Sequence, residues 1–355
     1  MSDRLTIEPL LAVDTESNSL FAYQEQVCLI QFSIPGLDYL VDPLAVRDLS
    51  SLAPLFSNPK IEKVLHGAEY DVTCLARDFN FKIDNLFDTR VASRTLAWKR
   101  NGLSDLLEQV LSINVDKRFQ RANWGKRPLS SEMLDYARLD THYLLKLRDY
   151  FHQLLRNKGS LEEAQELCER MTNPPRRENG FNPEDFWRIA HSRELSQRKA
   201  AILRELYLMR DRHARRQDRP PFKILGDQGL LAIAKSGPRT ADELHGLSGV
   251  TNNVIRRYGA EFITAVEEGL KAPFPQKPRN RRLDEAAHAR YEALREWRKN
   301  AAKKRGVESD LILPRDLLVE IATCVPHDLA ALREIMDPLE SRFQRYGKNI
   351  LKIIR

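Results

Sequence analysis

The first strongly hydrophobic stretch of the chain is followed at once by two acidic residues. Four consecutive apolar residues at positions 10–13 predict a β-strand that is buried on both faces. Asp14 and Glu16 follow with a spacing of two, so their side chains lie on the same side of the strand. Two carboxylates this close repel each other unless a cation lies between them, and such oxygen ligands favour Mg²⁺ or Mn²⁺ over Zn²⁺. By itself the pattern is common and also fits a strand that runs out into a solvated loop.

The residues after this strand predict a mixed sheet. Short runs rich in β-branched and aromatic residues, bounded by Gly, Pro and Asn, are typical of strands. Such runs occur at residues 27–33, 39–41, 63–65 and 85–88, and helical patterns occur at residues 52–56 and 70–78. The first three strands predict an antiparallel meander, whereas the later strands alternate with helices. We therefore expect an α/β domain with helices on both faces of a mixed sheet.

The second half of the chain is predicted to be helical. From residue 89 onward the pattern is mostly helical, apart from a predicted loop at 119–128. Two stretches rich in Pro, polar and basic residues, 172–180 and 271–282, have the composition of linkers. They divide the chain into three predicted domains at residues 1–172, 181–270 and 283–355. The last two domains form a weak internal repeat, because each holds a long basic helix and an R-Y-G sequence, which indicates duplication of a small helical module.

Charge separates the two halves of the chain. The 355 residues are 42% hydrophobic and 30% charged, which is typical of a soluble globular protein, and no uncharged run is long enough to span a membrane. Residues 1–172 contain 21 Lys and Arg against 25 Asp and Glu, whereas the remainder contains 36 against 25. An acidic half joined to a basic half suggests a polyanionic substrate that one part binds and the other processes.

The cysteines and the first residues bear on the cellular location. Cys28, Cys74, Cys168 and Cys324 are far apart and form no C-x-x-C pair. This spacing argues against a zinc site or a disulfide framework, and it fits buried thiols in a reducing cytoplasm. Acidic residues at positions 3 and 8 stand where a signal peptide would be basic or apolar, so we expect a cytoplasmic protein without membrane association.

Two further acidic motifs follow the first pair. A predicted strand ends at His66 and a helix begins after Gly67, which places Asp71 near the start of that helix. Tyr136 and Asp140 are four residues apart and therefore share one face of a later helix. The chain thus carries acidic side chains at three separate places where predicted strands or helices expose them.

Together these acids suit phosphodiester hydrolysis. The reaction must stabilise negative charge on the attacking and leaving oxygens, and two metal ions roughly 3.5–4 Å apart stabilise both. Holding two such ions takes roughly three or four carboxylates. Asp14, Glu16, Asp71 and Asp140 supply that number. Tyr136 is placed to orient the attacking water, because a free tyrosine is a poor base at neutral pH.

The three motifs taken together resemble those of the DEDD exonucleases. A tyrosine rather than a histidine four residues before Asp140 is similar to the DEDDy branch. The stretches LLAVDTES, KVLHGAEYDVTCL, NLFDTRVASR, WGKRPLS and LDYARLDTHYLL resemble the ribonuclease D family. The two helical blocks resemble HRDC domains, the first, with ARRQDRPPFKILGDQGLLAIAK, more closely than the second.

The resemblance implies a fold, a chemistry and a substrate. It implies a ribonuclease-H-like α/β exonuclease domain with a mixed sheet, followed by two all-α HRDC-type domains. It also implies two divalent metal ions, Mg²⁺ or Mn²⁺, and 3′→5′ removal of single nucleotides from RNA ends, typically those of transfer-RNA precursors. By this resemblance Asp14, Glu16, Asp71 and Asp140 are metal ligands, and Tyr136 positions or activates the water. We expect the protein to be a monomer.

Other residues are candidates for substrate contact. By the same resemblance Thr15 and Leu20 lie where the family's site touches the 3′-terminal nucleotide, although Leu20 also fits a core position. His66 is either a contact for the terminal nucleotide or phosphate, or a structural histidine at a strand end. Trp124 and Arg127 fit a loop that stacks on bases and pairs with phosphate. Trp124 also fits packing beneath that loop.

Three functions are considered on the sequence alone. The favoured one is an RNA 3′-exonuclease. A DNA 3′→5′ exonuclease of repair type would use the same acids, but no polymerase or helicase body accompanies them, and residues 125–127 lack the Gly-rich lead of a P-loop. A non-catalytic RNA-binding scaffold is the third, and the intact set of acids argues against it.

Overall fold

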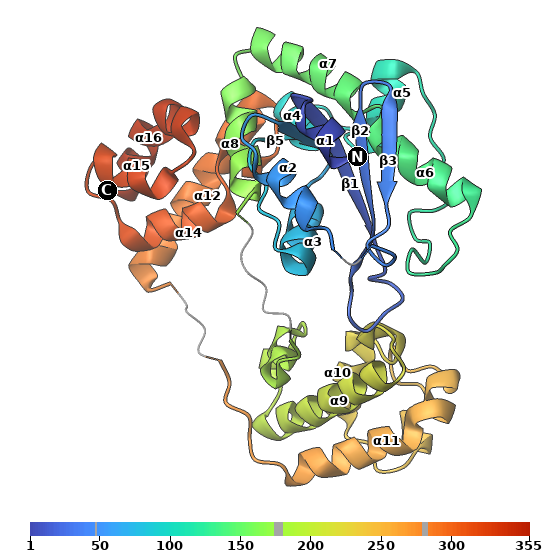
Figure 1. Ribbon diagram of the computed structural model, residues 1–355. Coiled ribbons are helices and arrows are strands. Elements are labelled where there is room, and N and C mark those ends of the chain that lie inside the picture. Colours follow the sequence, from blue (N-terminus) through green and yellow to red (C-terminus); the bar gives the residue numbers. More distant parts are fainter. Residues whose placement is uncertain (47, 174–179, 279–282) are drawn as a thin grey trace. The chain divides into compact units, whose positions relative to one another are not determined.

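The computed structural model describes residues 1–46, 48–173, 180–278 and 283–355 (Figure 1). Contacts divide the chain into two compact units, the first of residues 1–17, 27–177 and 282–355, and the second of residues 18–26 and 178–281. Of the two predicted linkers, residues 174–179 and 279–282 lie outside the described residues. Among the described residues no helix combines the length and the apolar character needed to cross a membrane.

A mixed sheet forms the centre of the first unit (Figure 1). Its described strands are β1 (Leu10–Ser17), β2 (Val27–Ile34), β3 (Leu37–Val41), β4 (Glu62–Leu65) and β5 (Leu86–Asp88). They lie in the order β3-β2-β1-β4-β5. β1–β2 and β2–β3 are antiparallel, whereas β1–β4 and β4–β5 are parallel. The predicted mixed sheet, with a meander first and parallel strands later, is therefore confirmed.

The central strand β1 and its neighbour β2 are covered on both faces. Residues 11–13 of β1 are fully buried, and every residue of β2 is buried. The register pairs Asp14 directly with Gln31. Directly opposed residues point to the same face of a sheet, so Asp14 and Gln31 share a face. Ser33 of β2 also lies on this face, and its hydroxyl forms a 2.7 Å hydrogen bond with that of Thr141.

Helices complete the α/β part of the first unit. They are α1 (Ser2–Thr6), η1 (Ser50–Leu52), α2 (Ala53–Ser57), α3 (Glu69–Phe79), α4 (Thr89–Thr95), α5 (Leu103–Leu111), α6 (Ser131–His142), α7 (Leu144–Asn157) and α8 (Leu161–Met171). α6 packs against β1, β2 and β3, and α7 packs against β1 and β4. Residues 112–130 between α5 and α6 form no helix or strand, so the predicted loop at 119–128 is part of a longer irregular segment.

The last helical block belongs to the first unit. It contains α12 (Glu285–Arg305), α13 (Ser309–Ile312), α14 (Arg315–Cys324), α15 (Leu329–Met336) and α16 (Glu340–Ile354) around a core of its own. Packing of α16 against α8 joins the block to the α/β part. Cys28, Cys74 and Cys168 are buried as expected, whereas Cys324 at the end of α14 is exposed, which corrects the expectation of four buried thiols.

A fully buried arginine holds that junction. Arg342 of α16 donates hydrogen bonds to the carbonyl oxygens of Leu311 (3.0 Å) and Glu163 (2.7 Å). It also donates to the carboxylate of Glu166 on α8 (2.6 Å). Because a buried guanidinium is strongly unfavourable without such partners, these bonds compensate for the burial of Arg342 at the contact between α16 and α8.

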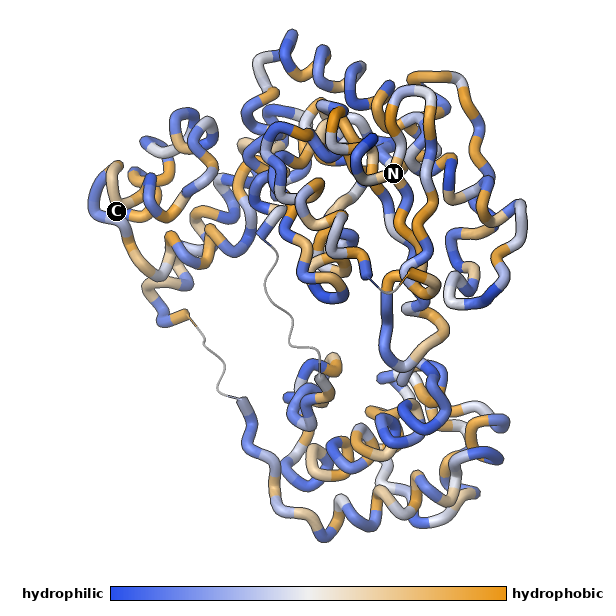
Figure 2. Tube along the Cα trace, in the orientation of Figure 1, coloured by the Kyte–Doolittle hydropathy of each residue, from blue (hydrophilic) through white to orange (hydrophobic). Residues whose placement is uncertain are grey.

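The second unit is a small helical bundle with its own core. It contains η2 (Pro183–Arg188), η3 (Ser192–Glu194), α9 (Gln197–Arg216), η4 (Pro221–Lys223), α10 (Asp227–Ser236), η5 (Asp242–Leu244) and α11 (Asn252–Lys271). Figure 2 shows hydrophobic and hydrophilic residues alternating along α9 and α11, as expected of amphipathic helices that pack together. The two helices approach closely at Gly269, where an added Cβ would lie 2.4 Å from the Cα of Ile202.

Arg342→Ala should lower the free energy of unfolding of the protein by about 3–5 kcal/mol, because it leaves the buried Glu166 without its partner. The matched control Arg333→Ala removes an exposed ion pair with Glu340 and should change it by less than about 1 kcal/mol. Urea denaturation followed by circular dichroism measures both. Equal effects of the two substitutions would contradict a structural role for the buried pair.

Candidate active site

Three carboxylates meet where β1 ends beneath α6. Asp14 and Glu16 lie in the last half of β1, and Asp140 lies on α6. One oxygen atom from each of the three carboxylates lies within 4.8 Å of the other two, and all three side chains are half-buried. The structure thus brings together three of the four predicted metal ligands.

The fourth predicted ligand is tied to the same strand. Asp71 is the third residue of α3 and is 7% exposed. Its Oδ1 accepts a 2.5 Å hydrogen bond from the hydroxyl of Thr15, which stands between Asp14 and Glu16 in β1. The charge of Asp71 acts directly on the carboxyl group of Asp14 and raises its pKa. Thr15 therefore positions an acid of the cluster; its contact with a nucleotide stays a prediction.

Asp88, which the sequence analysis did not single out, fixes the start of α3. It is 1% exposed, and its carboxylate accepts hydrogen bonds from the backbone N–H groups of Gly67 (3.1 Å) and Ala68 (2.7 Å). It also caps α4 by accepting from the N–H groups of Arg90 and Val91. Gly67 has a φ of +75°, a conformation that favours glycine. The signal in the sequence was an aspartate between a strand and a helix, the usual place of an N-cap.

His66 is held by a neighbouring strand end. Its Nδ1 lies 2.9 Å from the hydroxyl of Thr89, which itself donates to the carbonyl of Leu65. Burial lowers the pKa of His66 to about 4, so the imidazole is neutral at physiological pH. These contacts favour the structural alternative for His66, and a neutral imidazole would contact a nucleotide as a hydrogen-bonding group rather than as a cation.

Burial raises the pKa of all four carboxyl groups, and it is the largest cause in each case. The pKa is about 9 for Glu16, about 7 for Asp140 and about 6 for Asp71. The pKa of Asp14 also lies well above its ordinary value, because repulsion from Asp71, Asp140 and Glu16 adds to its burial. Such a cluster is unfavourable as a set of anions unless cations neutralise it.

The donor set fits divalent cations that prefer oxygen ligands. The group that comes together among the described residues consists of carboxylates alone, with no His or Cys. Carboxylate oxygens suit Mg²⁺ and Mn²⁺ rather than Zn²⁺. No Lys or Arg of the described residues forms an ion pair with Asp14, Glu16 or Asp140, so this part of the chain supplies no counter-charge to the three acids at short range.

Tyr136 is packed beside the acids. It is 7% exposed, and its ring lies 6.1 Å from that of Trp124 and 5.8 Å from that of Phe119, measured between ring centroids. Burial, followed by the charges of Asp140 and Glu16, raises its pKa, so the hydroxyl stays protonated at neutral pH. The Tyr136 hydroxyl donates to Asp140, one helical turn later, and thereby lowers the pKa of that acid relative to burial alone.

Two predicted substrate contacts have structural roles here. Trp124 is 1% exposed, so the packing alternative is the one that the structure shows, and its ring offers no open face to a base. The Arg127 guanidinium donates to both carboxylate oxygens of Asp42 (2.7 and 2.6 Å) and to the carbonyl oxygen of Cys28 (2.8 Å). Those bonds anchor the irregular segment to β2 and leave Arg127 poorly placed to pair with phosphate. Leu20 belongs to the second unit and is 38% exposed, which does not fit a core position.

Three segments of the chain match known protein families. Residues 1–156 match a 3′-5′ exonuclease family, and residues 199–266 and 287–354 each match the HRDC domain family. Exosome complex exonuclease RRP6 of Saccharomyces cerevisiae is 35% identical over 279 residues, covering 74% of this chain and 38% of the yeast protein. Ribonuclease D of Nitrobacter hamburgensis is 29% identical and covers 93% of this chain and 87% of its own length. The chain thus spans only about a third of the length of the exosome relatives that it matches.

Solved structures agree with this assignment. The catalytic core of RRP6 from Trypanosoma brucei is 31% identical, with a TM-score of 0.64 over 77% of this chain and 78% of the other. Escherichia coli RNase D, described as an exoribonuclease involved in structured RNA processing, is 25% identical, with a TM-score of 0.68 over 97% of this chain and 96% of its own. The chain therefore belongs to the ribonuclease D/RRP6 family, with a 3′-5′ exonuclease domain and two HRDC domains.

Proposed function

We propose that this protein is a metal-dependent 3′→5′ exoribonuclease that hydrolyses phosphodiester bonds and releases nucleoside 5′-monophosphates. The observation that carries the proposal is the cluster of Asp14, Glu16 and Asp140, with Asp71 linked to it through Thr15. No basic side chain of the described residues forms an ion pair with the three clustered acids. Family membership supports the direction of hydrolysis, and the similarity to an exoribonuclease, E. coli RNase D, supports RNA as the substrate.

The chain's own residues have distinct roles in this proposal. Asp14, Glu16, Asp71 and Asp140 hold two divalent cations, Mg²⁺ or Mn²⁺, which when bound stabilise negative charge on the attacking and leaving oxygens. The raised pKa of Tyr136 makes it a poor base, so its hydroxyl orients the attacking water from its position beside Asp140. Asp88 has a structural role in this proposal: its carboxylate accepts backbone hydrogen bonds that hold the turn before α3, the helix that carries Asp71.

Finer features of the function are part of the proposal. We propose the 3′ ends of transfer-RNA precursors as substrates, a cytoplasmic location and a monomeric state. We also propose domain boundaries at residues 1–172, 181–270 and 283–355. The three family matches, at residues 1–156, 199–266 and 287–354, lie within these domains and support the proposal, and the last domain shares a compact unit with the first.

Asp14→Asn, Asp71→Asn and Asp140→Asn should each lower the rate of hydrolysis of single-stranded RNA by at least about 100-fold. Each substitution removes one carboxylate that binds the cations, and these cations stabilise negative charge on the attacking and leaving oxygens. A 3′→5′ ladder from 5′-labelled RNA with Mg²⁺ measures this, and DNA of the same sequence tests the alternative substrate. Asp135→Asn on the exposed side of the same helix is the control and should keep full activity. Full activity in any of the three would refute the four-acid site.

Tyr136→Phe should lower turnover by about 10²–10⁴-fold, the range of a positioned proton-transfer or water-orienting group, while Mg²⁺ affinity stays near that of the unchanged protein. The substitution keeps the packing against Trp124 and every carboxylate. Single-turnover kinetics at saturating Mg²⁺ measures the effect, with Tyr150→Phe on the exposed side of α7 as the control. Unchanged turnover would make Tyr136 a packing residue only.

Without metal, the protein should lose stability as the pH rises. A carboxyl group whose pKa is raised in the folded state favours folding below its unfolded pKa, about 4, and this contribution is lost as the pH rises through its folded pKa. The pKa values of Asp71, Asp140 and Glu16 in the folded protein are about 6, 7 and 9, so this stability is lost between about pH 4 and about pH 9. Bound cations reverse it, so Mg²⁺ should raise the Tm more at pH 8 than at pH 6.

The same melting curves provide a control for this pH dependence. Asp14→Asn removes one of the mutually repelling charges, so in EDTA it should lose less stability with rising pH than the unchanged protein. Its Mg²⁺-induced rise in Tm should also shrink, because one ligand is lost. If the Asp14→Asn protein had the same pH profile of stability and the same Mg²⁺-induced rise in Tm as the unchanged protein, the acid cluster would not be the source of either effect.

A further inference from the structure

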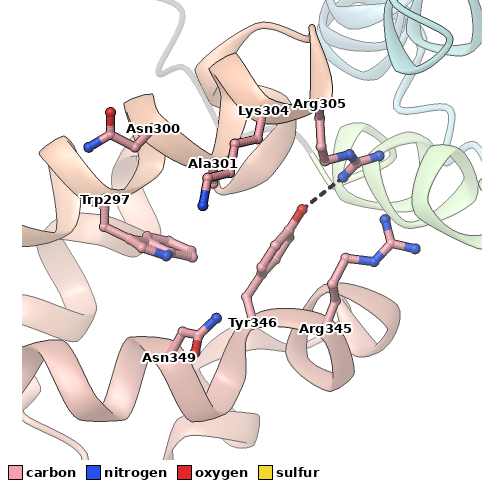
Figure 3. Close-up of a pocket in the computed structure, with 8 residues that line it drawn as sticks. All are labelled: Trp297, Asn300, Ala301, Lys304, Arg305, Arg345, Tyr346 and Asn349. Atoms are coloured by element: carbon pink, nitrogen blue, oxygen red, sulfur yellow. Dashed lines mark hydrogen bonds between the residues drawn. The ribbon is translucent and has the colours of Figure 1, made fainter.

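A second candidate binding site lies in the last helical domain, between α12 and α16 (Figure 3). The pocket has a volume of about 400 Å³, within the range of roughly 300–1,000 Å³ that is typical of small-ligand sites. Its lining residues come from two helices: Trp297, Asn300, Ala301, Lys304 and Arg305 from α12, and Arg345, Tyr346 and Asn349 from α16. None of these residues takes part in the candidate active site.

Two aromatic rings form the apolar wall of the pocket. Trp297 and Tyr346 meet edge to face, with ring centroids 5.5 Å apart and an interplanar angle of 77°. Figure 3 shows the Tyr346 hydroxyl held by Arg305, which donates a 3.0 Å hydrogen bond to it. The tyrosine is only 8% exposed, and the tryptophan is half-buried. The wall is therefore rigid, with aromatic surface available mainly on Trp297.

The rim of the pocket is basic, and part of its charge is fixed by the exonuclease domain. Arg305 and Arg345 both form ion pairs with Glu163 of α8, which is 2% exposed. Lys304 and Asn349 are exposed, and the side chain of neither forms a hydrogen bond or ion pair with another described residue. The helices α12 and α16 together carry eleven Lys and Arg against four Asp and Glu. The pocket therefore joins an aromatic wall to a rim with a net positive charge, on which Lys304 has no described acidic partner.

We propose that this pocket binds one unpaired nucleotide of an RNA strand. The base stacks on Trp297, the amide of Asn349 meets the polar edge of the base, and Lys304 pairs with the adjacent phosphate. The amide nitrogen of Asn300 instead donates to Glu296 (3.4 Å). An acidic peptide would satisfy Lys304 but would leave the aromatic wall and the Asn349 amide without a matching partner. The choice of RNA rests on the proposed function; the pocket's chemistry by itself indicates a single-stranded nucleic acid.

The test measures binding separately from hydrolysis. Fluorescence anisotropy of a fluorescein-labelled oligouridine is titrated with the full chain in EDTA, which prevents hydrolysis. Trp297→Leu should weaken binding by about fivefold or more through lost stacking. Lys304→Glu, an exposed change that keeps the core intact, should weaken binding and reduce the slope of log affinity against log salt by about one. The matched control is Lys299→Glu, which replaces an exposed lysine on the same helix outside the pocket. It should change the affinity and the salt slope less than Lys304→Glu does.

Further arms identify the ligand. An oligomer with abasic sites should bind the unchanged protein about as weakly as oligouridine binds Trp297→Leu. Equal affinity for the abasic and the base-carrying oligomers would overturn the proposal, as would identical effects of Lys304→Glu and Lys299→Glu. Displacement of oligouridine by an oligoglutamate peptide at matched charge, but not by abasic RNA, would assign the pocket to an acidic peptide and also overturn it.

A short oligonucleotide separates this proposal from the proposed function. Lys304→Glu should hydrolyse a saturating trinucleotide with Mg²⁺ at the rate of the unchanged protein, whereas Asp14→Asn should not. If the unchanged protein fails to hydrolyse RNA yet loses oligouridine binding on Lys304→Glu, the proposed function fails and the pocket stands. If hydrolysis proceeds and the pocket variants bind as tightly as the control, the pocket proposal alone fails.

Discussion

The repulsion among buried carboxylates is the constraint on which the rest of the exonuclease domain depends. Asp14, Glu16 and Asp140 bring oxygen atoms within 4.8 Å of one another, and Asp71 raises the pKa of Asp14 from nearby. Each of these groups is also desolvated, so as anions they oppose folding in the absence of metal. A protein keeps such an arrangement only where a ligand compensates for it, which links the instability of the empty site directly to the chemistry that cations supply there.

Two other buried acids of this chain, Glu163 and Glu166, have a structural role and are neutralised by arginines. Glu163 of α8 is 2% exposed and is paired with two arginines from the last helical domain, and Glu166 is paired with the buried Arg342. No described Lys or Arg forms an ion pair with the three clustered acids of the candidate active site. The acids that join the last helical domain to α8 are therefore neutralised by arginines, whereas the acids of the candidate active site are available to bind cations.

The sequence predicted the strands and the acids well because both depend on local patterns. The apolar run at residues 10–13, the period of two that joins Asp14 to Glu16, and the four-residue spacing of Tyr136 and Asp140 all appear in the structure as expected. Long-range contacts were harder to predict. Trp124 and Arg127 look like a nucleic-acid-binding loop in sequence, yet Trp124 packs under Tyr136 and Arg127 bonds to β2 and to Asp42.

Residues that act through the backbone were also missed. Asp88 holds the turn at Gly67 through the N–H groups of Gly67 and Ala68, which are 21 and 20 positions away, and no local pattern indicates such partners. Only its capping of α4, through the N–H groups of Arg90 and Val91, is local. The docking of the last domain was missed for a similar reason, because Arg342 and Glu166 are 176 positions apart and resemble ordinary charged helix residues. Composition marked the domains, but only the fold shows which of them share a buried charge.

Anomalous diffraction from crystals soaked in Mn²⁺ shows whether the clustered acids hold divalent cations. We expect anomalous peaks within about 2.0–2.6 Å of carboxylate oxygens of Asp14, Glu16, Asp71 and Asp140, the range of carboxylate–cation distances for hard divalent ions. We also expect these peaks to be lost or weakened in Asp14→Asn crystals soaked in the same way. Well-ordered carboxylates with no anomalous peak at saturating Mn²⁺, in crystals of the unchanged protein, would contradict cation binding by the clustered acids.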